Sequence, residues 1–273
     1  MIAFANAKIN LGLYITTKRP DGYHSIESIF LPISLSDVIE VVPSVQPGIS
    51  FKTEGIVVDG NAENNLCVKA YNLLKEEFDI PGVEVFLLKN IPIGAGLGGG
   101  SSDAAFTLKS LNSLFELNLS PDELKVRAAM LGSDCPFFID NKSAFVSGRG
   151  EVMEVVETGL DGMPIVVVHP GIHISTFEAY RNIHPQAAPH NLKELLKQPI
   201  DEWQRHVRND FEPFMIDRFP EIGFIKSELI EAGATYAAMS GSGSAVYGIF
   251  NSHVEIPHSL KNYFSVKAVA GLL

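Results

Sequence analysis

Residues 92–102 have the clearest chemical potential in the chain. They read PIGAGLGGGSS and contain five glycines between an apolar run, residues 83–88, and a segment with helical periodicity, residues 103–117. Glycine lets a backbone adopt positive φ and approach a ligand closely. The N–H groups at a helix N-terminus converge on an anion, and the helix dipole favours negative charge there. The stretch therefore predicts a phosphate-binding loop. A flexible surface loop is the alternative, but such loops seldom lie between two core elements.

Three known classes of phosphate-binding loop do not fit this stretch. GAGLGG matches G-x-G-x-x-G, but a dinucleotide loop follows the first strand of a βαβ unit and needs an acidic residue closing the next strand. Here the acidic residue, Glu116, falls within predicted helix. A Walker A loop needs a lysine, which Gly100-Ser101-Ser102 lacks, and the H-R-D and D-F-G motifs of protein kinases do not occur. The loop belongs to another class.

A lysine and two asparagines share one face of a predicted strand near the start. Residues 5–15 read ANAKINLGLYI and alternate, with Asn6, Lys8 and Asn10 opposite the apolar positions. A solvated strand face is one interpretation of Lys8. Because Asn is depleted in ordinary strands, a polar cleft is the other.

Asp134 lies in GSDCPFF, after a predicted helix and two residues before Pro136. An Asp in such apolar surroundings is either stabilised by backbone amides or is a catalytic carboxylate kept ionised by a nearby cation. The residues alone leave both interpretations open.

Tyr23 and His24 follow RPDG, which has the Pro and Gly positions of a type I turn. A planar aromatic beside a side chain that donates and accepts hydrogen bonds suits a flat heterocycle. The alternative is a turn-flanking Tyr that covers the core. A second glycine-serine segment, SGSGS at residues 240–244, lies between two predicted strands and is typical of a hairpin turn.

The composition describes an acidic globular protein. The chain has 273 residues, 46% hydrophobic and 19% charged, with a formal net charge of −11. An acidic surface disfavours nucleic acid and anionic lipid as partners, but not a small anionic ligand. Cys67 and Cys135 lack metal-site or disulfide spacing, as in a reducing compartment. With no signal-like or membrane-length apolar run, we expect a cytoplasmic protein with no membrane partner. The sequence does not indicate an oligomeric state.

The predicted elements divide the chain into two parts. The first third is strand-rich, and a helix over residues 66–78 begins at Asn64 or Asn65. A capping box, Ser120 to Glu123, opens a helix that ends near Gly132. The pattern loosens over residues 148–163, and strands and helices then alternate, which favours a ferredoxin-like α+β sandwich. Predicted helices there include 203–211 and 257–264. We expect domains at residues 1–158 and 159–273.

These motifs together resemble a known family. PIGAGLGGGSSDAA is similar to the nucleotide loop of the galactokinase, homoserine kinase, mevalonate kinase and phosphomevalonate kinase (GHMP) superfamily. Its first motif is matched by AKINLGLYI and its third by SGSGSAVYGIF, in the family's order. The opening AKINLGLYITTKRPDGYHSIESIF and the stretch LGSDCPFF most resemble the members that act on a cytidine diphosphate derivative of methylerythritol in the non-mevalonate isoprenoid pathway. The resemblance implies an α+β, two-domain GHMP kinase fold, with a ribosomal protein S5 domain 2-like N-terminal domain and a ferredoxin-like C-terminal domain.

The resemblance also implies an ATP-dependent phosphorylation of the 2-hydroxyl of that substrate. Lys8 and Asp134 match the family's catalytic pair: Asp134 would accept the alcohol proton, and Lys8 would keep the carboxylate ionised and stabilise developing charge. Mg²⁺ is expected with the ATP. Its protein ligands are not identified, although Ser102 is available. The alternatives are a GHMP kinase for homoserine, mevalonate or a sugar, and a non-catalytic nucleotide-binding protein, which loss of the pair would have signalled.

The remaining implied roles are binding roles. The ATP-binding residues implied by the resemblance are Asn65, on the adenine side, and Pro92, Ile93, Gly94, Ala95, Gly96, Leu97, Gly98, Gly99, Gly100, Ser101 and Ser102. The substrate-binding residues are Asn10, Tyr23, His24, Tyr180, Gly241, Ser242 and Gly243, with Tyr23, His24 and Tyr180 at the cytosine.

Overall fold

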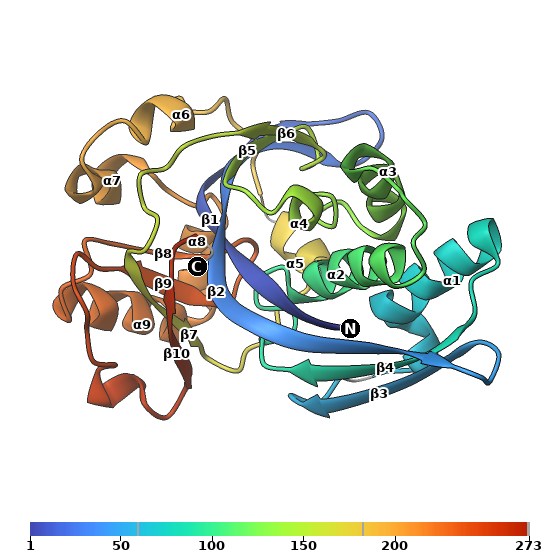
Figure 1. Ribbon diagram of the computed structural model, residues 1–273. Coiled ribbons are helices and arrows are strands. Elements are labelled where there is room, and N and C mark those ends of the chain that lie inside the picture. The colour runs from blue at the N-terminus through green and yellow to red at the C-terminus, as the bar shows by residue number, and fades with distance from the viewer. Residues whose placement is uncertain (59, 182, 272–273) are drawn as a thin grey trace. The chain divides into compact units, whose positions relative to one another are not determined.

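The computed structural model describes residues 1–58, 60–181 and 183–271 (Figure 1). The chain forms two compact units that interleave along the sequence. Unit 1 comprises Met1–Ala7, Ser36–Ile93 and Gly98–Asn141, and unit 2 comprises Lys8–Leu35, Gly94–Leu97 and Lys142–Leu273. The long strands β1 (Ile2–Lys18) and β2 (His24–Ser44) each contribute to both units.

The other elements each belong to one unit. Those of unit 1 are β3 (Ile49–Gly55), a 3-10 turn (Ala62–Asn64), α1 (Leu66–Phe78), β4 (Gly82–Lys89), α2 (Gly99–Leu114), α3 (Pro121–Leu131) and α4 (Phe137–Asp140). Those of unit 2 are β5 (Ala144–Ser147), β6 (Val152–Val155), β7 (Pro164–His169), α5 (Thr176–Arg181), α6 (Leu192–Leu195), α7 (Ile200–His206), α8 (Glu212–Arg218), α9 (Pro220–Glu231), β8 (Tyr236–Met239), β9 (Val246–Ile249), a 3-10 turn (His258–Leu260) and β10 (Phe264–Val269).

Unit 1 packs its helices on one side of a strand layer (Figure 1). Within it, β4 pairs in parallel with β3 and antiparallel with the second half of β2. The inward positions Val83, Val85 and Leu87 alternate along β4, as a half-buried strand requires. The Asn65 side chain accepts the Cys67 N–H at 2.9 Å and caps α1, and Ser120 with Glu123 forms the capping box of α3. Both predicted helix starts are confirmed.

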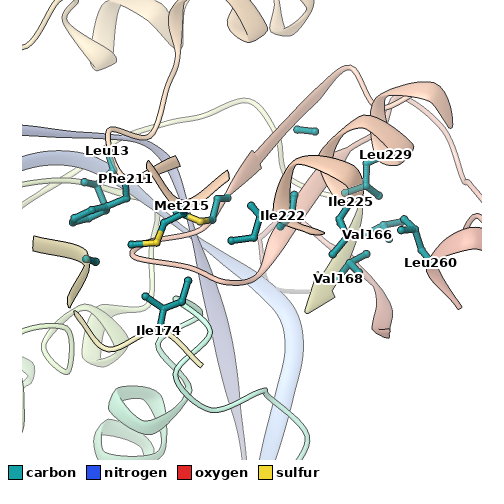
Figure 2. Close-up of a cluster of buried hydrophobic side chains, with 14 of the residues drawn as sticks. Leu13, Val166, Val168, Ile174, Phe211, Met215, Ile222, Ile225, Leu229 and Leu260 are labelled. Atoms are coloured by element: carbon teal, nitrogen blue, oxygen red, sulfur yellow. The ribbon is translucent and has the colours of Figure 1, made fainter. Parts of the chain in front are cut away.

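Unit 2 contains a four-stranded antiparallel sheet in the order β10-β7-β9-β8. The predicted hairpin is confirmed, because β8 and β9 pair through Met239 and Val246 on either side of residues 240–245. Part of β1 also joins this unit, through a bridge from Leu13 to Asn209. The hydrophobic core draws on β1, β2, the sheet and helices α8 and α9 (Figure 2); it includes Leu13, Ile15, Ile26, Val166, Val168, Phe211, Met215, Ile222, Ile225 and Leu229.

The structure corrects several predicted boundaries. The glycine loop is shorter than predicted, because α2 begins at Gly99, so that residues 99–102 form its first turn. Gly99 and Ser102 are buried there, and this packing overrides the loop-like composition. The predicted helix 203–211 is wrong beyond His206, where α7 ends, because α8 begins only at Glu212. The predicted helix 257–264 is replaced by the 3-10 turn His258–Leu260, and Phe264 already belongs to β10. Among the described residues, no helix is both long and apolar enough to cross a membrane.

Candidate active site

The glycine loop is divided between the two units. Gly94–Leu97 belongs to unit 2, whereas Gly98 and the helix that follows belong to unit 1. Gly96 and Gly98 have φ angles of 78° and 72°, in the left-handed region that favours glycine.

The N-terminus of α2 is suited to bind an anion. Helices α1 and α3 are capped by side chains, but the N-cap residue of α2 is Gly98, which makes no side-chain cap hydrogen bond. The first N–H groups of a helix have no acceptor within the helix. In a helix of 16 residues these N–H groups and the dipole favour a bound phosphate.

A buried charge cluster in unit 1 links the end of β4, just before the glycine loop, to the first turns of α2, just after it. The Asp37 carboxylate accepts hydrogen bonds from the backbone N–H groups of Asn90 at 2.6 Å and Ile91 at 2.8 Å, just before the loop. Lys89 donates to Asp37 and, at 2.8 Å, to Asp103 in α2. Gly99 leaves room for this lysine, since a Cβ there would lie 2.9 Å from Nζ. The cluster therefore fixes the chain entering the loop relative to the helix leaving it.

The charges within this cluster do not balance, because two buried carboxylates share one ammonium. Burial would lower the pKa of Lys89, but attraction by Asp103 and Asp37 outweighs it and raises that pKa. Burial raises the pKa of Asp103 to about 7, and the Asp37 charge adds to the rise while Lys89 opposes it. Asp103 Oδ1 and the Ser102 hydroxyl are buried with no hydrogen-bond partner. Sequence reasoning missed Asp37 and Lys89, which read as ordinary strand residues.

Asp134 lies beside the start of α2 within unit 1. It is half-buried, in the turn between α3 and α4, and its neighbours Cys135 and Phe137 are buried. Burial raises the pKa of the Cys135 thiol to about 11, with an opposing hydrogen bond from Ser101 and a further rise from the Asp134 charge. The Asp134 turn thus packs on the first turn of α2, next to the predicted phosphate site.

Lys8 is buried in unit 2 with its ammonium among oxygen atoms. Its Nζ donates to Asn10 Oδ1 at 2.6 Å and to the Gly96 carbonyl at 3.1 Å, and lies 4.5 Å from the centre of the Phe30 ring. The backbone N–H of Lys8 donates to the Leu97 carbonyl at 3.0 Å. The structure therefore places Lys8 against the glycine loop, and Asn10, predicted to line the substrate cleft, against Lys8.

The second glycine-serine loop, residues 240–244, also forms hydrogen bonds to residues 94–97 within unit 2. The Ser240 hydroxyl donates to the Gly96 carbonyl at 2.9 Å, and the Ala245 N–H donates to the Ala95 carbonyl at 3.1 Å. A Cβ on Gly96 would overlap the Ser240 carbonyl oxygen, so this approach requires glycine.

Asn209 in turn supports the second loop, and sequence reasoning missed it. This buried side chain donates to the carbonyls of Met239 at 2.9 Å and Gly241 at 2.8 Å. No local pattern marks a loop asparagine whose partners lie about 30 positions away in the chain.

The three residues predicted at the cytosine are near one another in unit 2, but not as one stack. His24 stacks on Tyr180 with ring centroids 5.0 Å apart and an interplanar angle of 20°. Tyr23 is 59% exposed, and the Arg149 guanidinium lies 4.9 Å from the centre of its ring. Burial, with a smaller effect of Lys18, lowers the pKa of His24 and favours its neutral form. A neutral imidazole can both donate and accept a hydrogen bond.

Comparison with known proteins places this site in a family. The GHMP kinases N terminal domain model matches residues 65–148, and the GHMP kinases C terminal model matches residues 191–265. A relative from Bacteroides thetaiotaomicron, named 4-diphosphocytidyl-2-C-methyl-D-erythritol kinase, is 49% identical and aligns over 95% of each chain. The chain belongs to the 4-diphosphocytidyl-2-C-methyl-D-erythritol kinase family. Its two GHMP kinase matches lie on either side of residue 158, the predicted domain boundary, which stays a prediction.

Solved structures agree with the family assignment. A crystal structure of 4-(cytidine 5'-diphospho)-2C-methyl-D-erythritol kinase superimposes with a TM-score of 0.85 at 32% identity, over 99% of each chain. The Methanococcus jannaschii mevalonate kinase superimposes with a TM-score of 0.72 at 14% identity, which shows a shared fold only. The predicted two-domain GHMP kinase fold is confirmed, and with it ATP as the phosphate donor of this family.

Few protein groups among the described residues are placed to bind Mg²⁺. The described residues contain no group of three or more His, Cys, Asp or Glu side chains placed to hold a metal ion. Mg²⁺ usually keeps several waters and binds through one or two protein groups and the substrate phosphates, so such a group is not required. The unpartnered Ser102 hydroxyl in the first turn of α2 fits that pattern.

Proposed function

We propose that the protein transfers the γ-phosphoryl group of ATP to the 2-hydroxyl of 4-diphosphocytidyl-2-C-methyl-D-erythritol, giving the 2-phosphate and ADP. The observation that carries the proposal is the 49% identity, over 95% of each chain, to a relative named as that kinase. The presence of both Lys8 and Asp134 supports it. The reaction belongs to the non-mevalonate pathway of isoprenoid biosynthesis. We expect it in the cytoplasm, in keeping with two free, buried cysteines.

Asp134 is the general base of the proposed reaction. It removes the proton from the tertiary 2-hydroxyl as the oxygen attacks the γ-phosphorus, and the bond from that phosphorus to the bridging oxygen of ADP breaks. Its half-buried turn next to the start of α2 suits this role. A positioned base contributes typically about 10²- to 10⁴-fold to a rate.

Lys8 stabilises the negative charge that develops on the transferred group. Phosphoryl transfer depends mainly on positioning and charge stabilisation, which a fixed ammonium supplies. The oxygens of Asn10 and Gly96 hold that ammonium in unit 2.

The loop from Pro92 to Ser102 binds the ATP phosphates through backbone N–H groups, with Asn65 on the adenine side. Mg²⁺ bound with ATP, for which Ser102 is the available hydroxyl, neutralises phosphate charge. Tyr23, His24 and Tyr180 bind the cytosine, and Asn10, Gly241, Ser242 and Gly243 line the acceptor site. The stack of His24 on Tyr180 supports an aromatic site in this region.

The test is a direct assay of the purified protein. ADP release is measured with ATP, Mg²⁺ and 4-diphosphocytidyl-2-C-methyl-D-erythritol, and ³¹P NMR identifies the product monophosphate. Homoserine, mevalonate and galactose serve as alternative acceptors. Of these acceptors, we expect only the cytidyl substrate to be phosphorylated. We expect Asp134→Asn to lower kcat about 10²- to 10⁴-fold while the protein stays folded. Turnover with another acceptor instead, or near-normal turnover of the variant, would contradict the proposal.

A further inference from the structure

A chain of buried hydrogen bonds runs behind Lys8, entirely within unit 2. Lys8, Asn10 and Ser28 are 3%, 2% and 0% exposed. Lys8 donates to Asn10 Oδ1 at 2.6 Å, Asn10 Nδ2 donates to Ser28 Oγ at 2.8 Å, and the Ser28 hydroxyl donates to the Gly12 carbonyl at 2.6 Å. Neither Ser28 nor Gly12 was among the residues predicted for the site.

The chemistry of the two ends gives this chain a single direction. A lysine ammonium has only donors, so the Asn10 atom against it must be the oxygen. A backbone carbonyl only accepts, so the hydroxyl hydrogen of Ser28 points to Gly12. Its oxygen is then the acceptor for the Asn10 NH₂ group. A reversed amide would place NH₂ against the ammonium and leave two oxygens without a hydrogen between them.

The Gly12 carbonyl, which accepts the last hydrogen bond of this chain, is fixed by the backbone conformation of Gly12. Gly12 has a φ of 67° inside β1, and a Cβ there would lie 2.7 Å from the Leu192 side chain. A left-handed glycine within a strand marks a local bend or bulge. The carbonyl that receives the Ser28 hydroxyl therefore has its place set by the backbone of β1, independently of any ligand.

Asn10 is also held by its backbone. Its carbonyl accepts the Tyr247 hydroxyl at 2.6 Å, and its N–H donates to Ser240 Oγ at 3.3 Å. With the backbone held in this way, rotation of the side-chain amide is the remaining freedom, and Ser28 removes it.

We propose that Ser28 is a positioning residue, which fixes the Asn10 amide so that its oxygen holds the Lys8 ammonium in place for phosphoryl transfer. The inference rests on the proposed function, because it gives Lys8 the charge-stabilising role. Ser28 acts through Asn10 and does not touch the substrate. Its removal lowers the rate of the chemical step without weakening the binding of ATP, whose proposed binding residues do not include Asn10.

The test compares Ser28→Ala, Ser28→Thr and a matched control, Ser34→Ala. Ser34 is on the same strand β2, and its hydroxyl accepts a backbone hydrogen bond from Val269 at 3.0 Å. Misplacement of a catalytic group by about 1 Å costs on the order of 10²-fold, so we expect Ser28→Ala to lower kcat about 10- to 100-fold. The KM for ATP should change less than about threefold, since its proposed binding residues do not depend on Asn10. Ser28→Thr keeps the hydroxyl, so its kcat should return to that of the parent. The control Ser34→Ala should also keep the parent kcat.

A second arm separates positioning from a merely structural role. In an Asn10→Ala background Ser28 has no amide to orient, so Ser28→Ala should change kcat less than about twofold there. If Ser28→Ala does not fold, Ser28→Cys replaces it, with nearly the same volume but a weak donor and acceptor.

A parent-like kcat for the Ser28 variant, or effects of Ser28→Ala and Asn10→Ala that multiply, would overturn the proposal. Lys8→Met distinguishes a failure of the proposed role of Lys8 from a failure of the positioning role of Ser28. If Lys8→Met keeps its kcat, the proposed role of Lys8 fails; if it loses activity while Ser28→Ala does not, only the positioning role fails.

Discussion

Replacing Asp103 by asparagine should change how the stability of the protein depends on pH. Asp103 shares Lys89 with Asp37, and its pKa is raised to about 7 by burial and by the Asp37 charge, against the opposing effect of Lys89. In the unfolded chain an aspartate titrates near 3.9. Between these two values the folded protein binds a proton that the unfolded chain has lost. The free energy of unfolding therefore falls as the pH rises from about 4 to about 7, and this contribution is constant above that range.

The size of the effect follows from the same difference. At about 1.4 kcal/mol for each pH unit, a pKa of about 7 in the folded protein corresponds to a loss of up to about 4 kcal/mol between pH 4 and pH 8. The Asp103→Asn variant would have no such titration at this position, because an amide is neutral throughout. We expect the stability of Asp103→Asn relative to the parent to rise across this range by a few kcal/mol.

Urea unfolding at intervals between pH 4 and pH 8 measures this difference. Asp122→Asn is the control, because Asp122 forms a surface ion pair with Lys125 and its carboxylate side chain is 92% exposed. Exposed pairs contribute about 0–1 kcal/mol, so its curve should follow that of the parent. A difference between Asp103→Asn and the parent that is flat or falls with rising pH would contradict this prediction, and would show that Lys89 governs the titration.

Three further predictions concern the loops and the aromatic residues. Gly96→Ala should lower the free energy of unfolding by about 1–3 kcal/mol, because it strains a left-handed backbone and clashes with the Ser240 carbonyl; an unchanged urea midpoint would contradict this. Asn209→Ala leaves two buried carbonyls without donors, so thermal unfolding should show a loss of about 2 kcal/mol or more, and a loss below about 0.5 kcal/mol would count against its role. Tyr23→Ala should weaken CDP binding in calorimetry by about 1–3 kcal/mol and leave ATP binding unchanged, whereas equal losses would remove Tyr23 from the cytosine site.

The features predicted correctly from the sequence depend on neighbours in the chain. Asn65 caps α1 and the Ser120 box opens α3 because each cap bonds to an N–H two or three residues away. The β8–β9 hairpin follows from two short strands around one turn. The two-domain fold was predicted correctly from the resemblance to GHMP kinases. The motif residues Lys8 and Asp134 remain the proposed catalytic pair.

The features missed depend on partners far apart in the chain. Lys89 meets Asp37 across 52 positions, and the Asn10 N–H meets Ser240 across 230. Spacing cannot indicate such pairs, because tertiary packing brings them together. The early start of α2 has a related cause, since buried contacts at Gly99 and Ser102 override a composition that favours a loop.

The interleaving of unit 2 has a consequence for how the protein folds during synthesis. Leu13 and Ile15 lie near the start of the chain, yet they belong to the same core as Phe211 and Met215. At about 5–20 residues per second, roughly 10–40 s pass before a ribosome that has made Leu13 reaches Phe211. During that time the apolar face of β1 lacks its partners from α8. Leu13 and Ile15 are therefore made long before their partners Phe211 and Met215, and during that interval these apolar side chains of the nascent chain need protection from aggregation.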